Sequence, residues 1–250
     1  MSARFLEAQA AIAGVAGWLS EDQARRLFNA AAAVAAPGPI VEIGSFHGRS
    51  TIILAKAAAG DVAIVAIDPH AGGDRGPQEI EDDRARGEGD HRAFQANLGR
   101  AGVAQSVRHV RRRSGEAHPE VRAPIAMLYV DGAHRFAPAR EDIVRWGQRV
   151  KPGGTMLIHD AFSSIGVTLA IARELVWGRD FLYEGRSRSL AQYRRTSVPL
   201  RGRDRARNCL RQLAQLPWFV RNVAIKLALV SKLPGLAGLL GHPARDRWPY

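Results

Sequence analysis

Between residues 36 and 200, short apolar runs alternate with stretches that have the hydrophobic spacing of a helix. The apolar runs of strand length cover 40–44, 62–67, 107–110, 125–130 and 155–158. The helical stretches that separate and follow them cover 50–59, 89–101, 138–149 and 164–177. This alternation predicts a doubly wound α/β domain, in which right-handed crossovers join the strands of a mostly parallel sheet. Two more runs, 181–184 and 189–193 with Gly185 between them, predict a closing antiparallel hairpin and bring the sheet to seven strands.

The chain divides into three parts. Its 250 residues, 46% of them hydrophobic, are enough to bury a full core. Residues 1–35 are rich in alanine, carry apolar side chains such as Trp18 near helical spacing, and contain Ser20 before two acids, which is typical of a helix start. We therefore expect an N-terminal helical cover over 1–35, the α/β domain over 36–200 and a C-terminal extension over 201–250.

The positive charge is concentrated in the extension. The formal net charge is +12, and residues 201–250 hold ten Arg or Lys against Asp204 and Asp246. Apolar and aromatic residues are interspersed with these cations, and Pro217 and Pro234 divide the stretch into helical pieces. Such a basic amphipathic stretch favours an anionic membrane surface. Alternatively, its apolar faces pack on the domain or at a homodimer interface. Nucleic acid is disfavoured, because no recognition motif accompanies the cations.

Cysteine usage and segment lengths indicate where the protein resides. Cys209 is the single cysteine, so an internal disulfide and a cysteine-based zinc site are excluded. The first residues lack the basic start, the continuous apolar centre and the cleavage site of a signal peptide. No uncharged apolar run reaches the roughly 18 residues of a transmembrane helix, which excludes such a helix on length. We expect a cytoplasmic protein that is peripheral to the membrane through its extension.

Four of the expected strands end in an acid, namely Glu42, Asp68, Asp131 and Asp160. The carboxyl ends of parallel strands meet at one edge of the sheet, where open α/β sheets bind their ligands. Aspartate also favours such junctions as a turn former, but this explains one acid better than it explains the set of four. The sequence therefore predicts a ligand site bordered by carboxylates.

The junction after the first strand, residues 42–51, reads EIGSFHGRST. Gly44 permits a tight turn and Gly48 a close backbone approach, and the helix that follows presents free N–H groups to an anionic part of a ligand. A dinucleotide fingerprint needs a glycine at the position of Phe46, so NAD is disfavoured. The carboxylate of Glu42 suits a ligand that carries positive charge, such as an ammonium or sulfonium group.

Asp68 lies twenty residues after Gly48, at the end of the second strand, where an acid can accept hydrogen bonds from both ribose hydroxyls. The pattern Glu-x-Gly-x-aromatic-x-Gly-x-Ser followed by this Asp resembles class I S-adenosylmethionine-dependent methyltransferases. The resemblance is closest to O-methyltransferases of the catechol and caffeoyl-CoA type and of the macrolide-sugar type. It covers about residues 38–165 and includes three later motifs, Asp131-Gly132-Ala133-His134, Lys151-Pro152-Gly153-Gly154 and Ile158-His159-Asp160.

The resemblance implies a Rossmann-like methyltransferase fold that binds S-adenosylmethionine. It places the methionine part of this cofactor against Glu42, Gly44, Phe46, Gly48 and Ser50. It places the ribose at Asp68 and the adenine at Ser114, which belongs to a Ser-Gly-Glu segment after the third strand. That triplet is also a common helix cap, which is the alternative interpretation.

A magnesium site is indicated by two of the acids. Asp131 and Asp160 end neighbouring strands about 5 Å apart, close enough to share a cation. Metal-dependent members of the resembling group place an acid pair, or an acid beside an amide, at the end of the fifth strand. Here that dipeptide is His159-Asp160, so the resemblance implies Mg²⁺ at Asp131, Asp160 and His159, although Mg²⁺ prefers oxygen to nitrogen. The alternative is that the two acids bind substrate or cap helices.

A catalytic base is expected at His134, three residues after Asp131, because the resembling enzymes place their base at this offset. A neutral imidazole can take the proton of a hydroxyl near pH 7, and Asp131 would help to anchor the substrate. The alternative is a surface histidine that opens a helix. The polar stretch 72–89, which contains five glycines, predicts a long loop that closes over the acceptor or an insertion without a role.

These features together predict an S-adenosylmethionine-dependent O-methyltransferase that acts on a hydroxyl of a small metabolite or sugar. The sulfonium is an activated donor, so the protein has only to align and deprotonate the acceptor. The alternative from another class is a non-catalytic module that keeps this fold and is recruited to a membrane or a protein partner.

Overall fold

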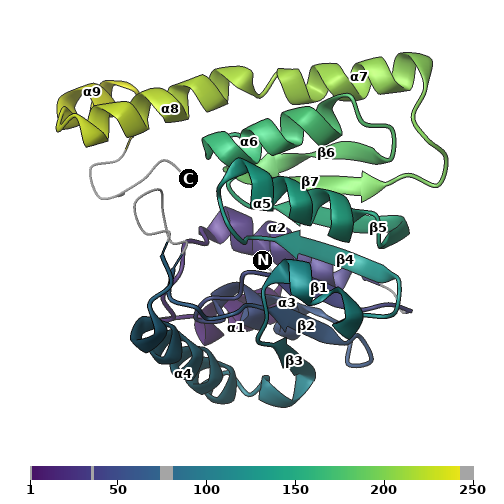
Figure 1. Ribbon diagram of the computed structural model, residues 1–250, viewed down its shortest axis with the longest axis vertical. Helices are drawn as coiled ribbons and strands as arrows, with labels where there is room; N and C mark the ends of the chain where they lie inside the picture. Colours follow the sequence, from purple (N-terminus) through teal and green to yellow (C-terminus); the bar gives the residue numbers. More distant parts are fainter. Residues whose placement is uncertain (1, 35–36, 74–80, 243–250) are drawn as a thin grey trace.

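The structure is a computed structural model that describes residues 2–34, 37–73 and 81–242. Its centre is a seven-stranded sheet with the strand order β3-β2-β1-β4-β5-β7-β6 (Figure 1). The strands are β1 (Ile40–Ile43), β2 (Ile64–Ile67), β3 (Val107–Val110), β4 (Ile125–Val130), β5 (Val150–Ile158), β6 (Phe181–Ser187) and β7 (Leu190–Arg195). The first five strands are parallel, and β7 is antiparallel to both of its neighbours. The predicted doubly wound, mostly parallel sheet is confirmed.

Helices cover both faces of the sheet (Figure 1). One face packs against α1 (Ala3–Ala11), α2 (Glu21–Ala32), α3 (Arg49–Ala57) and α4 (Arg84–Arg100). The other face packs against α5 (Phe136–Glu141) with its π-helical continuation η4 (Asp142–Trp146), and α6 (Ile165–Ile171) with η5 (Ala172–Val176). The described part of the domain also has the 3₁₀ turns η1 (Ala104–Ser106), η2 (Ser114–Glu116) and η3 (His118–Glu120). Because both faces are covered, β1 and β2 are buried along their whole length.

The two helices expected before the first strand are present. Ser20 caps α2: its hydroxyl accepts from the backbone N–H of Gln23, and the Gln23 side chain accepts from the backbone N–H of Ser20 at 2.8 Å. Phe5 of α1 lies in one apolar cluster with Ile40 and Met127 of the sheet. The N-terminal helices therefore contribute to the core, while the domain boundaries proposed from the sequence stay a prediction.

The long loop expected over 72–89 is shorter than predicted. Helix α4 begins at Arg84, because the Asp83 side chain accepts a hydrogen bond from the backbone N–H of Arg86 at 3.0 Å and so caps the helix. Residues 74–80 lie outside the described residues, and the idea that this stretch closes over the acceptor stays a prediction.

The antiparallel hairpin is confirmed, but its turn was placed wrongly. Strand β6 continues to Ser187 and β7 begins at Leu190, so the chain reverses at Arg188 and Ser189. Gly185 lies inside β6, where the pairing with β7 has an irregularity. A glycine with positive φ in a strand therefore marks a bulge here and not the turn.

The extension folds into α7 (Gly202–Leu213), α8 (Leu216–Val230) and α9 (Pro234–Leu239). Pro217 and Pro234 lie in the first turns of α8 and α9, where a helix tolerates proline. By length and composition alone, the run Gly202–Val230 could cross a membrane, and 17% of its most apolar window is buried. The exclusion of a membrane span from the absence of an uncharged run was therefore too strict, although one such helix is weak support for a span.

Candidate active site

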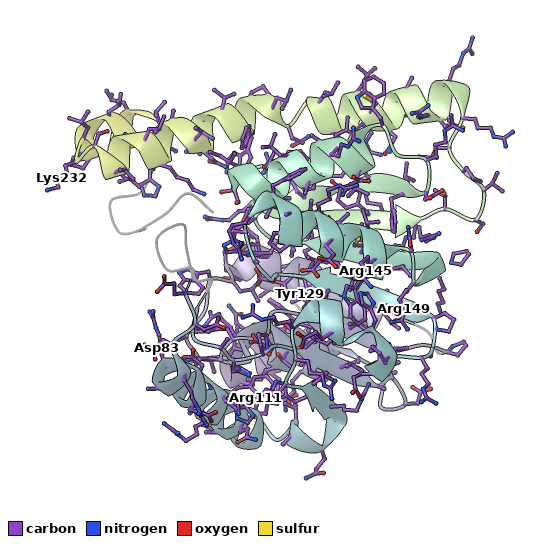
Figure 2. The ribbon with its side chains drawn as sticks, viewed as in Figure 1. Asp83, Arg111, Tyr129, Arg145, Arg149 and Lys232 are labelled. Atoms are coloured by element: carbon purple, nitrogen blue, oxygen red, sulfur yellow. The ribbon has the colours of Figure 1, made fainter. Side chains whose placement is uncertain are left out.

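A cavity of about 420 Å³ lies at the carboxyl ends of the central strands. Its walls come from the turn after β1, from the segments that follow β2, β3 and β4, and from the connection between α1 and α2. Tyr129 of β4, labelled at the centre of Figure 2, forms part of the lining. Of the expected site residues, the cavity is lined by Gly44, Phe46, Ser50, Asp68, Ser114, Asp131 and His134.

The turn after β1 requires glycine at two positions. Gly44 has a φ of 84°, and a Cβ atom there would lie 2.1 Å from the carbonyl oxygen of Asp131. Gly48 has a φ of 85° and precedes the first residue of α3. The turn can therefore pass close to the end of β4 and present the N-terminus of α3 beneath the cavity.

Asp68 holds this turn in place. One of its carboxylate oxygens accepts the backbone N–H groups of Ser45 at 2.9 Å and Phe46 at 2.8 Å, and the other accepts that of His70 at 2.7 Å. The Asp68 side chain also lines the cavity. A carboxylate has lone pairs for further hydrogen bonds, so Asp68 can fix the turn and still bind a hydroxyl of a ligand.

Glu42 lies beneath the turn and does not line the cavity. Its carboxyl group accepts hydrogen bonds from the hydroxyls of Ser50 and Thr51 at the start of α3. Burial raises the pKa of Glu42 to about 8, against the effect of the two hydroxyls, and the charges of Asp131 and Asp68 add to the rise. Glu42 therefore positions the first turn of α3, and its predicted contact with the ligand is not seen. Gly48 likewise lies outside the lining.

The segment after β3 brings Ser114 to the cavity together with Asp142, a residue that the sequence analysis missed. Ser114 makes a side-chain hydrogen bond to Asp142, which is 3% exposed. Burial raises the pKa of Asp142 to about 7, although the hydrogen bond opposes the rise. A carboxyl group that is easily protonated can donate as well as accept, which suits a heterocyclic ligand with both kinds of polar atom.

The ends of β4 and β5 hold a cluster in which carboxylates and histidines alternate. His134 Nε2 lies 3.0 Å from Asp160 Oδ2. His159 Nδ1 lies 3.2 Å from Asp131 Oδ1 and 3.7 Å from Asp160 Oδ1. The hydroxyl of Tyr129 donates to Asp131 Oδ2 at 2.8 Å. The fold thus brings together His134, Asp131, Asp160 and His159, as the sequence predicted.

The alternation sets the protonation states of the cluster. Burial lowers the pKa of His159, but Asp131 and Asp160 outweigh it and raise that pKa to about 9. The pKa of His134 is also raised, because Asp160 and Asp131 outweigh the effect of burial. Burial acts to raise the pKa of Asp160, but the two histidines hold it well below its usual range. Asp160 is therefore a permanent anion between two imidazoles.

This arrangement does not fit the expected Mg²⁺ site. The ring of His159 lies between the two carboxylates, and Mg²⁺ prefers oxygen ligands in an octahedral arrangement. Within the described residues, no group of three or more His, Cys, Asp or Glu side chains is arranged to hold a metal ion. The expectation of magnesium at Asp131, Asp160 and His159 is not supported.

Comparison with known families decides what kind of domain surrounds this cavity. Residues 41–161, which run from β1 to just beyond β5, match a family model described as a methyltransferase domain. The chain carries a methyltransferase domain. With the seven-stranded fold, this match supports the resemblance to class I S-adenosylmethionine-dependent methyltransferases that the sequence motifs carry.

Solved structures share the fold of this methyltransferase. The O-methyltransferase TomG from Streptomyces achromogenes, in complex with SAM, is 21% identical, with 79% of this chain and 91% of that chain covered at a TM-score of 0.56. Cofactor-bound Rv0187 from MTB is 19% identical, with 79% and 91% covered at a TM-score of 0.55. The O-methyltransferase NovP is 14% identical, with 71% and 81% covered at a TM-score of 0.56.

Outside the segment that matches the family model, the connection between α1 and α2 supplies one wall of the methyltransferase cavity. Residues 16–19 line it, and Trp18 stacks on Phe46 with ring centroids 5.5 Å apart. Trp18 is 52% exposed, although the sequence pattern had placed it among the apolar residues of a helix. The sequence feature that pointed to this wall is a tryptophan that follows a glycine and lies between two stretches of helical spacing.

Proposed function

We propose that this methyltransferase transfers the methyl group of S-adenosylmethionine to a hydroxyl of a small metabolite or sugar. The observation that carries the proposal is the pairing of His134, which lines the cavity, with the buried Asp160 behind it. An acceptor hydroxyl must lose its proton during transfer, and a histidine oriented by a carboxylate is suited to take it. TomG and NovP, which share the fold, are O-methyltransferases by name.

The cofactor is proposed to lie along the turn after β1. The methionine part would contact Gly44, Phe46 and Ser50, and the ribose hydroxyls would donate to Asp68. Asp131 and Asp68 place negative charge near the cationic sulfonium, which favours the charged cofactor over its neutral thioether product. The adenine would lie against Ser114.

His134 is proposed as the base. Its Nε2 atom faces Asp160, so the tautomer with hydrogen on Nε2 leaves Nδ1 to accept the proton of the acceptor hydroxyl. The oxygen then forms a bond to the methyl carbon as the bond from that carbon to sulfur breaks, and the electron pair stays on sulfur. Asp160 stabilises the imidazolium that results. No step of this proposal uses a metal ion.

Cofactor binding tests the proposal first. Isothermal titration calorimetry should show S-adenosylmethionine binding to the wild-type protein, and Asp68→Ala should weaken it by about tenfold or more, because a charged hydrogen-bond acceptor is lost. His134→Ala should leave this affinity nearly unchanged and abolish methyl transfer to acceptors found in a screen of hydroxylated metabolites. Absence of cofactor binding at millimolar concentration would leave only the non-catalytic module.

A further inference from the structure

Helix α8 exposes an apolar stripe to solvent. Leu216, Val220, Leu227 and Val230 recur at the spacing of one helix face and have exposed fractions of 44%, 64%, 63% and 71%. Helix α9 and the residue before it extend this surface with Leu233, Leu236 and Leu239, which are 53%, 48% and 87% exposed. We call these seven residues the apolar stripe.

The polar side chains of α8 face the opposite way, toward the protein. The guanidinium of Arg221 donates to the carbonyl oxygens of Leu240 at 2.7 Å and Gly241 at 2.9 Å. Asn222 is fully buried and donates to the carbonyl of Phe162, and Lys226 donates to the carbonyl of Ser163 at 3.0 Å. A helix on the surface of a protein in water ordinarily has the reverse arrangement. The apolar stripe is therefore suited to a non-aqueous partner.

Positively charged residues lie next to the apolar stripe along the chain. Arg203, Arg207 and Arg211 on α7 are exposed, against the single acid Asp204 on that helix. Lys232 is exposed between α8 and α9, at the far end of the stripe (Figure 2). A row of exposed leucines and valines flanked by arginine and lysine matches a bilayer with anionic headgroups.

Packing on the domain decides how α8 can meet a bilayer. Asn222 and Lys226 fix one face of the helix to the carbonyl groups of Phe162 and Ser163 in the domain, so crossing the membrane would break these contacts. A helix held on one face and apolar on the other lies in the plane of the interface. In Figure 1, α7, α8 and α9 form a layer along one side of the molecule, outside α6.

We propose that the apolar stripe and the flanking cations dock this protein on an anionic membrane surface. The partners of Asn222 and Lys226, Phe162 and Ser163, belong to the loop that follows Asp160, so docking would occur beside the His134 side of the cavity. This docking goes beyond the proposed chemistry and does not depend on it.

Vesicle co-sedimentation tests the docking with the full chain. Wild-type protein should sediment with vesicles of phosphatidylcholine and phosphatidylglycerol, and more weakly with phosphatidylcholine alone or at high salt. The double variant Leu227→Asp with Val230→Asp should lower the partition coefficient by about a hundredfold, because two apolar contacts are lost and two negative charges face anionic lipid. Val198→Asp is the matched control, since Val198 is also 71% exposed but precedes α7. It should partition like the wild type.

Two results would overturn the docking. One is wild-type protein that stays in the supernatant with anionic vesicles at low salt, and the other is a double variant that partitions like the Val198→Asp control. Light scattering behind a sizing column is run on the same samples. A wild-type dimer that the double variant converts to a monomer, without vesicle binding, would assign the apolar stripe to a second copy of the chain. Circular dichroism and urea unfolding of every variant report correct folding, so this test stays separate from that of the proposed function.

Discussion

Two buried carboxyl groups at the same edge of the sheet behave in opposite ways. Glu42, at the end of β1, is held by hydroxyls alone, and burial raises its pKa to about 8. Asp160, just after β5, is also buried, but His134 and His159 lower its pKa. Glu42 is subject to the charge of Asp131, and Asp160 shares the His159 ring with Asp131, so the two environments differ mainly in the cations around them.

The difference separates the roles of the two groups. A carboxyl group with a pKa near 8 is largely protonated at neutral pH and acts as a neutral link between β1 and α3. A carboxylate between two imidazoles keeps its charge and can support a histidine whose protonation state changes during a reaction. The link between β1 and α3 therefore rests on neutral hydrogen bonds, and the acceptor side of the cavity rests on paired charges.

Replacing Asp160 should have the largest effect. Asp160→Asn leaves His134 and His159 with one carboxylate fewer, which should lower stability by about 3 kcal/mol in urea unfolding, because a buried charge pair is broken. The rate of methyl transfer should fall by about a hundredfold, since the base loses its orienting carboxylate. Asp180→Asn, on an exposed side chain, is the control. Wild-type behaviour of Asp160→Asn would show that the charges of the acceptor side are not coupled.

Raising the pH should weaken the attraction between His159 and its two carboxylates, because the imidazole loses its proton. The pKa of His159 is about 9 in the folded protein, against 6.5 in an unfolded chain. Its stabilising contribution is fully present below pH 6.5 and is lost as the pH rises through 9. Urea unfolding across this range should show a loss on the order of 2 kcal/mol. Constant stability over this range would mean that His159 is neutral in the folded protein.

Replacing Glu42 by a residue that does not titrate should sharpen the contrast. The folded protein holds a proton on Glu42 between pH 4.5 and pH 8 that the unfolded chain has lost, so stability falls as the pH rises through this window. Glu42→Gln should remove this fall, so in urea unfolding its stability relative to the wild type should be higher at pH 8 than at pH 4.5. Glu7→Gln, at an exposed position, controls for the loss of a surface carboxyl. If the free energy of unfolding of Glu42→Gln fell with pH as steeply as that of the wild type, Glu42 would be charged in the folded wild-type protein.

The smallest expected effect comes from Tyr129. Tyr129→Phe removes the hydrogen bond to Asp131 and should cost about 1 kcal/mol of stability. Tyr193 is also fully buried and hydrogen-bonded through its hydroxyl, to Gln212, so Tyr193→Phe is the matched control for stability. Only Tyr129→Phe should also change the pKa of His159, measured by NMR titration. Equal His159 titration curves for the two variants would remove Tyr129 from the cluster.

The sheet was predictable because its signal is local. Apolar runs such as Ile40–Ile43 and Ile64–Ile67 are buried on both faces, which leaves a continuous hydrophobic stretch in the sequence. The turn of the hairpin and the start of α4 could not be predicted in this way. The bulge at Gly185 and the cap at Asp83 depend on individual strand pairings and hydrogen bonds.

The sequence predicted which residues meet at the site better than it predicted what each of them does there. Strand ends converge in any parallel sheet, so Asp68, Asp131 and Asp160 could be grouped from the sequence. The direction in which Glu42 points, and the position of His159 between two carboxylates, depend on tertiary packing. The sequence therefore suggested Mg²⁺ at Asp131, Asp160 and His159, where the structure places the His159 ring beside both carboxylates.

NMR titration of the histidines is the most direct measurement of the proposed active site, and it needs no acceptor. The imidazole of His134, assigned through His134→Gln, should titrate with a pKa above 6.5, and Asp160→Asn should lower that pKa. A His134 pKa at or below 6.5 that does not change in Asp160→Asn would contradict the pairing from which we infer the base.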